Sequence, residues 1–365
     1  MTLDPNYIWK VALALVTAAA ISLGLTPFVK FLANKVGAVD VPKDERRMHK
    51  VPIPRMGGLA IFLGFLVSAL IFVPMIERID TRLQGILLGS VLILILGVLD
   101  DIITLPALAK FPVQFIAAII VVLHGCRIDQ IFGWQLPLWL SYCGSVIWIV
   151  AMTNAINFID GLDGLAAGVS AISAGAMLVV ALLLVPQGNS MVSAILLAAV
   201  VGGCVGFIPY NFNPAKIFMG DTGSNFLGFI LASISIFGLF KTYAFISFAV
   251  PFLVLGLPIF DICFAVIRRV AHGQSPMHAD RGHFHHRLID MGFSQKQTVA
   301  IAYLLTAILG LAAVTLTGRR FVQVLIIAGA LAVVVVIGLV LVFNRHHHDI
   351  EALHEKEKEE KHEED

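Results

Sequence analysis

The stretch from residue 137 to residue 168, PLWLSYCGSVIWIVAMTNAINFIDGLDGLAAG, changes character halfway along. Its first half is an apolar run. Its second half carries Asn154, Asn157, Asp160 and Asp163, each three residues from the next. Burying a charged group in an apolar medium is costly, so a polar cluster directly after an apolar run is expected to have a specific purpose.

The composition extends the apolar character to the whole chain. Of 365 residues, 58% are hydrophobic and only 13% are charged, and the mean hydropathy is +0.91. A soluble domain usually has about 25% charged residues. Apolar runs near twenty residues recur, each long enough to cross a hydrocarbon core of about 30 Å as a helix. We therefore predict an all-α, polytopic integral membrane protein rather than a β-barrel, whose strands would alternate apolar and polar residues.

Eleven transmembrane spans are predicted from these runs. They cover residues 8–33, 57–75, 84–99, 107–124, 137–153, 162–185, 191–209, 225–240, 243–267, 298–317 and 321–343. No cleavable signal peptide is expected, since no basic segment precedes the first run. The expected organisation is a single transmembrane catalytic domain over residues 1–345 and a charged cytoplasmic tail over residues 346–365.

Basic residues concentrate in every second connection between the spans, which orients the chain with these connections in the cytoplasm. The connections assigned to this side cover residues 34–56, 100–110, 154–163, 210–224 and 268–297. The N-terminus is then outside and the C-terminus cytoplasmic, in a cell inner (cytoplasmic) membrane. Every polar cluster lies in the same connections. A transporter would keep ionisable groups near mid-membrane, so an active site on the cytoplasmic face is favoured.

Two of these clusters are acidic. Asp100 and Asp101 end the third span, and Lys110 is expected within reach at the start of the fourth. Adjacent carboxylates repel each other, and a divalent cation would relieve this; two solvated acids that end a helix are the alternative. In the opening stretch, the Asn and Asp residues are expected roughly on one helical face until Gly161 and Gly164 break the helix.

The segment FMGDTGS at residues 218–224 precedes the eighth span. Backbone amides at a helix N-terminus favour phosphate, and Asp221 could hold an accompanying metal. Phe218 could stack on a base. Asp261 lies inside the ninth span, where either a helix-cap role or pairing with a cation from the inner loops is left open. Cys126 and Cys143 flank one outer loop, and a disulfide between them is also left open.

The longest inner loop carries HADRGHFHHRL at residues 278–288. Its titratable residues include His283, His285, His286, Arg281 and Arg287. The spacing fits no zinc signature, so phosphate or substrate binding is favoured over a structural role or a zinc site. Lys50 and Arg55 offer further anion contacts, although a basic loop at the membrane also contacts lipid headgroups.

Four ordered motifs, LDDI, NAINFIDGLDGLAAG, NPAKIFMGDTGSNFLG and ADRGHFHHRL, resemble those of the polyprenyl-phosphate N-acetylhexosamine-1-phosphate transferases, the family of MraY, WecA and TagO. The resemblance covers roughly residues 20–345. The HxHH form of the last motif and the span count are closer to the GlcNAc branch than to the peptidoglycan branch of MraY.

The resemblance implies an enzyme that transfers GlcNAc-1-phosphate from UDP-GlcNAc to undecaprenyl phosphate, giving undecaprenyl-diphosphate-GlcNAc and UMP. It implies Mg²⁺, with Mn²⁺ as an alternative. The implied catalytic residues are Asp100, Asp101, Asp160, His283, His285 and His286, with Asp221 and Asp101 on the metal. The implied substrate-binding residues are Lys50, Arg55, Lys110, Asn154, Asn157, Asp163, Asn211, Phe218 and Arg281.

The expected partners are these two substrates and membrane lipid, with no nucleic acid; a homodimer is left open. The product would begin a surface glycan such as teichoic acid or the O antigen of lipopolysaccharide. Two alternatives remain: transfer from UDP-MurNAc-pentapeptide in peptidoglycan synthesis, and a lipid or sugar transporter that uses the polar loops as a gate.

Overall fold

The computed structural model describes residues 5–42, 51–131, 134–184, 189–239, 250–271 and 283–317. Its helices are α1 (Pro5–Val36), α2 (Gly58–Phe72), α3 (Thr81–Ile103), α4 (Ala107–Leu123), α5 (Leu138–Ile159), α6 (Leu165–Leu184), α7 (Ser190–Asn211), α8 (Gly220–Ile234), α10 (Gly256–Ala271), α11 (Phe284–Asp290) and α12 (Gln295–Thr317), with a π-helical segment η1 (Ser235–Leu239) after α8. Two antiparallel pairs of two-residue strands, β1 (Val39–Asp40) with β2 (Ile53–Pro54) and β3 (Gln130–Ile131) with β4 (Trp134–Gln135), are the only strands in these ranges.

Within the described residues, six helices are long and apolar enough to cross a membrane. They are α1, α3, α5, α6, α7 and α12, and the apolar helices α2 and α4 are shorter. The helical, polytopic class predicted from composition is thus confirmed. The predicted span at 321–343, and part of the one at 243–267, lie outside the described residues, so the count of eleven stays a prediction.

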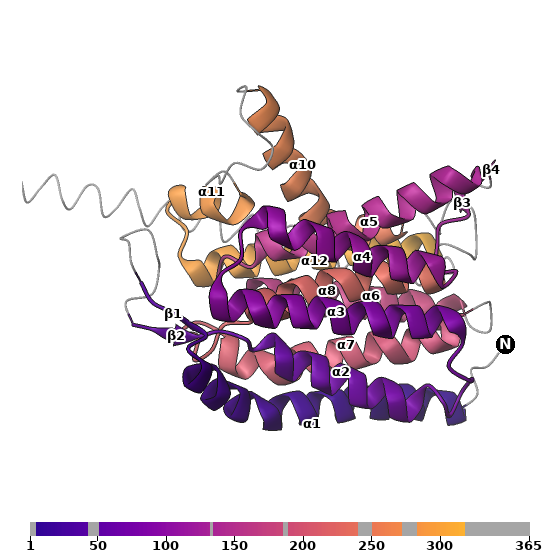
Figure 1. Ribbon diagram of the computed structural model, residues 1–365, viewed down its shortest axis with the longest axis horizontal. Coiled ribbons are helices and arrows are strands. Elements are labelled where there is room, and N and C mark those ends of the chain that lie inside the picture. Colours follow the sequence, from indigo (N-terminus) through magenta and orange to yellow (C-terminus); the bar gives the residue numbers. More distant parts are fainter. Residues whose placement is uncertain are drawn as a thin grey trace, which may run out of the picture.

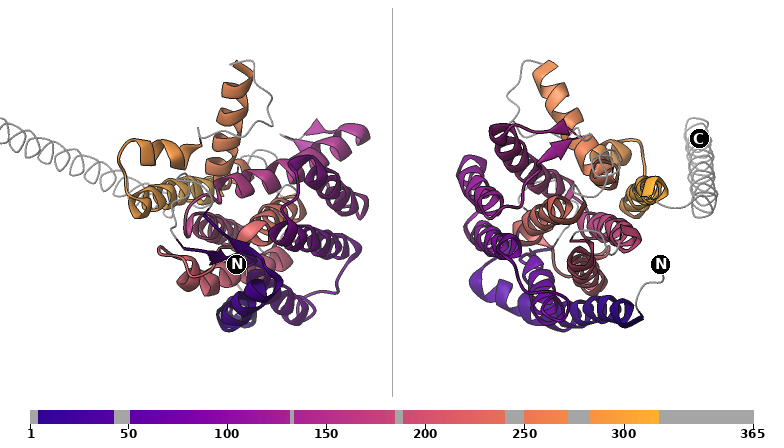
Figure 2. Two further views of the ribbon diagram at one scale, coloured as in Figure 1. Left: turned by 60° about the vertical axis from the view of Figure 1, so that its left-hand side comes forward. Right: turned by 90° about the vertical axis from the view of Figure 1, so that its right-hand side faces the viewer.

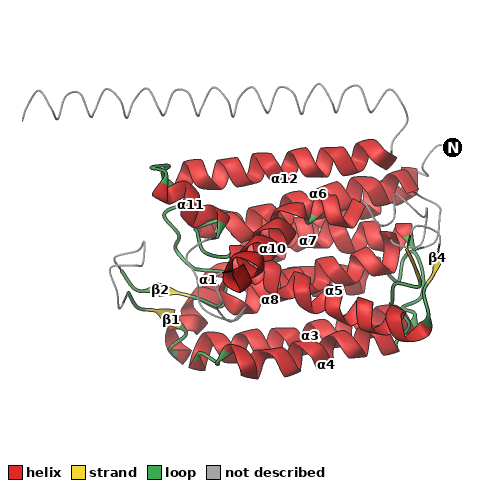
Figure 3. Cartoon of the chain, turned by 90° about the horizontal axis from the view of Figure 1, so that it is seen from above, coloured by secondary structure: helices red, strands yellow, loops and turns green. Residues whose placement is uncertain are grey.

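The long helices lie side by side along one axis of the molecule (Figures 1 and 3). The β1–β2 pair and α11 lie at one end, which we call the site end, and the β3–β4 pair lies at the opposite end. Viewed nearly along the helix axes, the bundle has α10 projecting from it (Figure 2, right). Cys126 and Cys143, near the opposite end, are free thiols, so the disulfide left open by the sequence is not formed.

Helix α8 is the core of the bundle. Every residue from Thr222 to Ile234 is buried, and α8 packs against α2, α3, α5, α6 and α7. A helix that is apolar on all sides belongs in such a position. Small residues bring its first turn close to α2, because a Cβ atom at Gly58 would collide with the backbone of Gly223.

Two helix boundaries differ from the predicted ones and matter for the site. Helix α5 continues to Ile159, six residues beyond the predicted span, so Asn154 and Asn157 are helical. Asp160 and Asp163 follow in a turn in which Gly164 has a φ of 78°, and their predicted place on the same helical face was wrong. Helix α8 begins at Gly220, so Asp221 lies in its first turn. A hydropathy pattern does not detect polar residues in the end turns of a helix, because neighbouring helices satisfy their hydrogen-bonding groups.

Candidate active site

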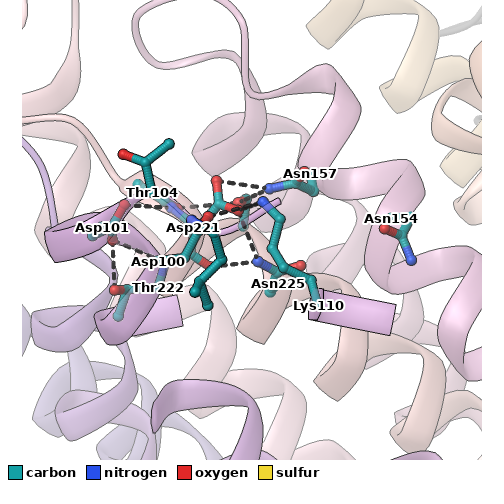
Figure 4. Close-up of polar contacts among 12 residues, drawn as sticks. Asp100, Asp101, Thr104, Lys110, Asn154, Asn157, Asp221, Thr222 and Asn225 are labelled. Carbon is teal, nitrogen blue, oxygen red and sulfur yellow. Dashed lines mark hydrogen bonds and ion pairs between the residues drawn. The ribbon is translucent and has the colours of Figure 1, made fainter. Parts of the chain in front are cut away.

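Lys110 joins two carboxylates from different helices at the site end (Figure 4). Its Nζ lies 2.8 Å from Asp100 Oδ2 and 2.6 Å from Asp221 Oδ2. Asp100 also accepts a hydrogen bond from the backbone N–H of Leu105, just past the end of α3. The predicted proximity of Lys110 to Asp100 is therefore present, and one ammonium group is shared by two acids. A shared cation leaves negative charge uncompensated, which suits a further cation.

Asp101 binds the N-terminus of α8. Its carboxylate accepts the backbone N–H of Asp221 at 3.0 Å, the N–H of Thr222 at 3.1 Å and the Thr222 hydroxyl at 2.6 Å. A carboxylate at a helix N-terminus is favoured by the unpaired amides and the helix dipole. Gly220 permits the approach, since a Cβ atom there would meet the Asp101 carboxylate. The amides expected to favour phosphate thus bind Asp101 in this structure.

Asn157 contacts the same acid from α5. Its Nδ2 donates to Asp221 Oδ1 at 3.2 Å and to Ser224 Oγ at 2.8 Å. Asp221 consequently has a different partner on each oxygen, Lys110 on Oδ2 and Asn157 on Oδ1. Its side chain is 25% exposed, and it lines a cavity. Asp221 is thus held in place while one face stays open to a ligand.

The DGLDG turn is fastened to the segment after α7. Asn211 accepts the N–H of Gly164 at 3.1 Å and donates to the carbonyl of Ile217 at 3.1 Å, and it is buried. Asp163 Oδ2 accepts the side-chain amide of Asn213 and the N–H of Ala215, both at 3.0 Å. Both loops therefore form one wall, whose shape these bonds determine.

Asp160 lines the same cavity, and the charged groups that act on its carboxyl group are the carboxylates of three other Asp residues. Burial of its carboxyl group raises its pKa well above the usual value of 3.8, and the nearby carboxylates of Asp221, Asp101 and Asp163 raise it further. A carboxyl group in such surroundings favours its neutral form, which donates a hydrogen bond. Asp160 can therefore act as a donor to a ligand at a pH where an exposed Asp cannot.

A second wall pairs the segment before α2 with the segment before α8. Phe218 N donates to Pro54 O at 2.8 Å, and Gly57 N donates to Phe218 O at 3.0 Å. This pairing places Arg55 and Phe218 on the same cavity. Arg55 donates through its terminal nitrogen to Thr104 Oγ1 at 3.0 Å, while its buried Nε has no hydrogen-bond partner. An unpaired buried guanidinium donor is suited to an anion.

The walls enclose a cavity of about 650 Å³. Its polar lining residues are Asp40, Arg55, Asp101, Asn157, Asp160, Asp163, Asn211, Asn213, Asp221, His286 and Gln295, and its apolar lining includes Phe218 and Leu162. Such a volume is typical of small-molecule sites. Carboxylates outnumber basic groups in the lining, so the cavity favours a ligand that arrives with a cation.

The three histidines of the HxHH motif have different surroundings. His283 Nδ1 lies 2.9 Å from Asp261 Oδ2, and Asp261 Oδ1 accepts the N–H of Phe284. Asp261 therefore holds the start of α11 and pairs with His283, which resolves its open role. His285 is buried behind Gly161 with both ring nitrogens unpaired, and burial lowers its pKa to about 4. His286 lines the cavity.

The remaining predicted residues are placed as follows. Asn154 does not line the cavity; it donates to Gln114 Oε1 at 2.7 Å, one turn below Asn157. Lys50 and Arg281 lie outside the described residues. The sequence did not single out several side chains at or directly behind the site: Thr222, Ser224, Asn213 and Gln295 contact its residues, and Gln114 and Asn225 lie behind them. Gln114 was detectable as an amide in an apolar run, four residues after Lys110.

The donor set fits a divalent cation of the Mg²⁺ type. Mg²⁺ is usually bound through one or two carboxylates together with substrate phosphates and water. Asp221 offers such a hard oxygen ligand at the cavity, and Asn157, which lines the same cavity, carries a second one in its side-chain amide. No group of three or more His, Cys, Asp or Glu side chains in the described ranges is arranged to hold a metal alone. The fit is therefore to a metal shared with a phosphorylated substrate.

Comparisons with known proteins agree with this picture. The family model described as glycosyl transferase family 4 matches residues 83–239. The chain is 41% identical over 315 residues to the probable undecaprenyl-phosphate N-acetylglucosaminyl 1-phosphate transferase of Bacillus subtilis (strain 168), covering 84% of this chain and 85% of that protein. It is 36% identical over 337 residues to decaprenyl-phosphate N-acetylglucosaminephosphotransferase of Mycobacterium tuberculosis (strain ATCC 25618 / H37Rv), covering 83% and 82%.

A further relative shares less of the chain. Phospho-N-acetylmuramoyl-pentapeptide-transferase of Geobacillus kaustophilus (strain HTA426) is 34% identical over 250 residues, covering 62% of this chain and 74% of that protein. The six helices long and apolar enough to cross a membrane, together with these transferase relatives, indicate an integral membrane enzyme. The chain belongs to glycosyl transferase family 4, and within it to the polyprenyl-phosphate GlcNAc-1-phosphate transferase branch.

Proposed function

We propose that this protein transfers GlcNAc-1-phosphate from UDP-GlcNAc to undecaprenyl phosphate, giving undecaprenyl-diphosphate-GlcNAc and UMP. The observation that carries the proposal is the Lys110 ammonium shared by Asp100 and by Asp221, which lines a polar cavity where apolar helices end. A soluble nucleotide sugar can enter the cavity, while a lipid phosphate can approach along the helices. The reaction joins a lipid phosphate oxygen to the sugar-bearing phosphorus and releases UMP with the bridging oxygen.

The diphosphate is proposed to lie against Lys110, Asp221 and Asn157. Mg²⁺ held by Asp221 and the Asn157 side-chain oxygen would neutralise the diphosphate charge and polarise the phosphorus, with Mn²⁺ as a substitute. An ammonium group has three N–H donors, and Lys110 directs two of them to carboxylates, so one can be donated to a phosphate oxygen. Catalysis of phosphoryl transfer rests mainly on such positioning and charge stabilisation.

Asp100 is proposed to orient the attacking lipid phosphate and to accept its proton where one is present. A phosphate monoester is already nucleophilic, so direct attack needs little activation by the protein. Asp100 lies at the end of α3, where it shares the Lys110 ammonium with Asp221. Asp101 is proposed to keep the first turn of α8 in place, and with it the Asp221 carboxylate.

The nucleoside is proposed to lie in the other half of the cavity, between the DGLDG turn and Phe218. Phe218 can stack on the uracil ring. The neutral form of Asp160 can donate a hydrogen bond, and Arg55, with an unpaired donor, can bind a phosphate. His286, the only histidine of its motif in the described cavity lining, is proposed to contact the diphosphate or the sugar.

The site end is proposed to face the cytoplasm of the cell inner membrane. The inner connections assigned by the positive-inside rule meet there: the ends of α3, α5 and α7 and the starts of α8 and α11. A soluble nucleotide sugar is a cytoplasmic substrate, which agrees with that orientation. The lipid-linked product would begin a surface glycan such as teichoic acid or O antigen.

The test is UMP release from purified protein with Mg²⁺ and undecaprenyl phosphate. UDP-GlcNAc, UDP-GalNAc and UDP-MurNAc-pentapeptide are supplied separately. Turnover of UDP-GlcNAc alone is the expected result. Turnover of UDP-MurNAc-pentapeptide alone would move the protein to the peptidoglycan reaction. Flux of substrate into liposomes without any UMP would make it a transporter.

A further inference from the structure

A second layer of polar side chains lies one helical turn below the Lys110–Asp221 contacts. We call it the amide layer, and it consists of Gln114, Asn154 and Asn225. Each member follows or precedes an active-site residue of its own helix by three or four residues: Gln114 follows Lys110 in α4, Asn154 precedes Asn157 in α5, and Asn225 follows Asp221 in α8. This spacing puts both members of each pair on one face of the helix.

The amides form one continuous chain of hydrogen bonds. Asn154 Nδ2 donates to Gln114 Oε1 at 2.7 Å, and Gln114 Nε2 donates to Asn225 Oδ1 at 3.1 Å. Asn225 Nδ2 then donates to the Asp221 backbone carbonyl at 2.9 Å and reaches Asp221 Oδ2 at 3.4 Å. The chain crosses from α5 through α4 to α8 and ends on the oxygen that also binds Lys110. Figure 4 shows Asn225 directed at Asp221 and Asn154 set apart from it.

The direction of the chain has an electrostatic consequence. Every amide donates toward Asp221, so the aligned dipoles place partial positive charge against its carboxylate. Aligned hydrogen bonds in a low-dielectric interior polarise one another. The layer can thus stabilise and orient the carboxylate without adding a formal charge that would compete with a bound cation.

Two of the three amides are buried inside the helix bundle. Gln114 is 2% exposed and Asn225 is 1% exposed. A buried amide costs free energy unless it is hydrogen-bonded, and an apolar side chain would pack in a helix bundle without that requirement. Below Asn225, helix α8 is apolar from Phe226 to Leu231 apart from Gly228. A polar layer directly beneath the site therefore calls for a role beyond packing.

We propose that the amide layer is a positioning device that holds Asp221 in line with Lys110, so that Gln114 and Asn225 act on the reaction through Asp221. This inference rests on the proposed phosphotransferase function. If the layer served only packing, loss of its hydrogen bonds would lower the stability of the protein but would leave the turnover of the folded enzyme unchanged.

The test interrupts the series of hydrogen bonds at Gln114, which contacts neither the cavity nor Asp221 directly. In Gln114→Met the side chain keeps its length and loses both hydrogen bonds. We expect kcat for UMP release to fall by about 10- to 100-fold, the loss typical of a hydrogen bond that supports a charged group, while KM for UDP-GlcNAc is unchanged. In Gln114→Glu two acceptors would face each other at Asn225 Oδ1, so the fall in kcat should be larger.

A second measurement needs no turnover. Binding of Mg²⁺ should raise the melting temperature of the wild-type protein, and the rise should be smaller in Gln114→Met at the same Mg²⁺ concentration. The matched control is Asn189→Ala at the opposite end, where a half-buried amide bonds the Phe237 carbonyl at 2.9 Å and accepts from Arg82. It should lower the melting temperature and leave both kcat and the Mg²⁺ response intact.

The outcomes separate the two proposals. If Gln114→Met lowers only the melting temperature, as the control does, the amide layer is packing and the inference is overturned. If wild-type protein releases no UMP from any UDP-sugar, the proposed function fails. In that case the comparison of Mg²⁺ responses still decides whether the layer positions Asp221.

Discussion

The two ends of the bundle both contain ion pairs, but they are built differently. At the opposite end, Arg82 meets Asp80 at 2.7 Å and Arg127 meets Asp129 at 2.8 Å. Each cation has its own carboxylate two residues away, and all four side chains are between 29% and 41% exposed. Exposed pairs of this kind contribute little, typically between about 0 and 1 kcal/mol. They fasten local turns.

At the site end, one cation serves two acids that are distant in the sequence. Asp100 is 7% exposed and Asp221 is 25% exposed, and Lys110 comes from a third helix. Burial makes any unmatched charge costly. The balanced, local pairs at one end are therefore structural, whereas the unbalanced, non-local cluster at the other end is suited to binding a charged ligand.

The largest effect should come from removing the open carboxylate of that cluster. Asp221→Asn should lower kcat by at least about 1,000-fold, because the variant loses a ligand for the cation that stabilises the transition state, and it should weaken the Mg²⁺ dependence of UDP-GlcNAc binding. UMP release and calorimetric titration measure these effects. Asp80→Asn, the matched change at the opposite end, should keep normal turnover. Near-normal activity of Asp221→Asn would refute the metal assignment.

A somewhat smaller effect is expected at the neighbouring acid. Asp100→Asn should lower kcat by about 100- to 10,000-fold, the range of general acid–base contributions, while the Kd for UDP-GlcNAc stays close to the wild-type value. The reason is that Asp100 is assigned to the lipid phosphate rather than to the nucleotide. Loss of nucleotide binding together with turnover would instead assign Asp100 a structural or metal role.

The pH dependence of stability should report on a buried histidine at the site end. The pKa of His285 is lowered to about 4 in the folded protein, so folding is favoured above the unfolded pKa near 6.5, and this stability is lost as the pH falls toward 4. The full loss is on the order of 3 kcal/mol, of which about 2 kcal/mol falls between pH 7.5 and pH 5. Unfolding in detergent at pH 7.5 and pH 5 should show it in the wild type and show less in His285→Gln. An equal response in both proteins would exclude His285 as the cause.

The smallest effect is expected at the opposite end. Arg127→Gln removes an exposed ion pair and a contact with Tyr142, so the free energy of unfolding should fall by no more than about 1 kcal/mol. UMP release should be unchanged. A large loss of activity in this variant would show that the two ends are coupled, and the division drawn between them would fail.

Much of the fold followed from local patterns. The length of the apolar runs predicted α1, α2, α3, α4 and α7 to within a few residues. Helix ends were less accurate where polar residues continue a helix. Each residue turns a helix by about 100°, so the three-residue spacing keeps side chains on one face only as long as the helix continues. For this reason Asp160 and Asp163 were placed on a helix that ends before them.

The site was predictable as a set of residues but not as a set of contacts. The sequence predicted Lys110 within reach of Asp100, and predicted Asp221 on the same side of the membrane from the charge of the connections. Nothing in the spacing indicated that Asn211 would be consumed by backbone contacts with Gly164 and Ile217. Nor did it indicate that Asn154 would reach the site only through Gln114.

The sequence by itself determined the class of the protein, its likeness to a family and the set of polar clusters from which a site could be proposed. Those conclusions depend on hydropathy, charge distribution and motif order, which are properties of the chain alone. Only the tertiary structure decided that Asp101 binds the start of α8, that Asp261 pairs with His283, and that Asp221 lies between Lys110 and Asn157. Those partners are up to 121 residues apart, and the packing of separate helices, with their rotation and close approach, selects them.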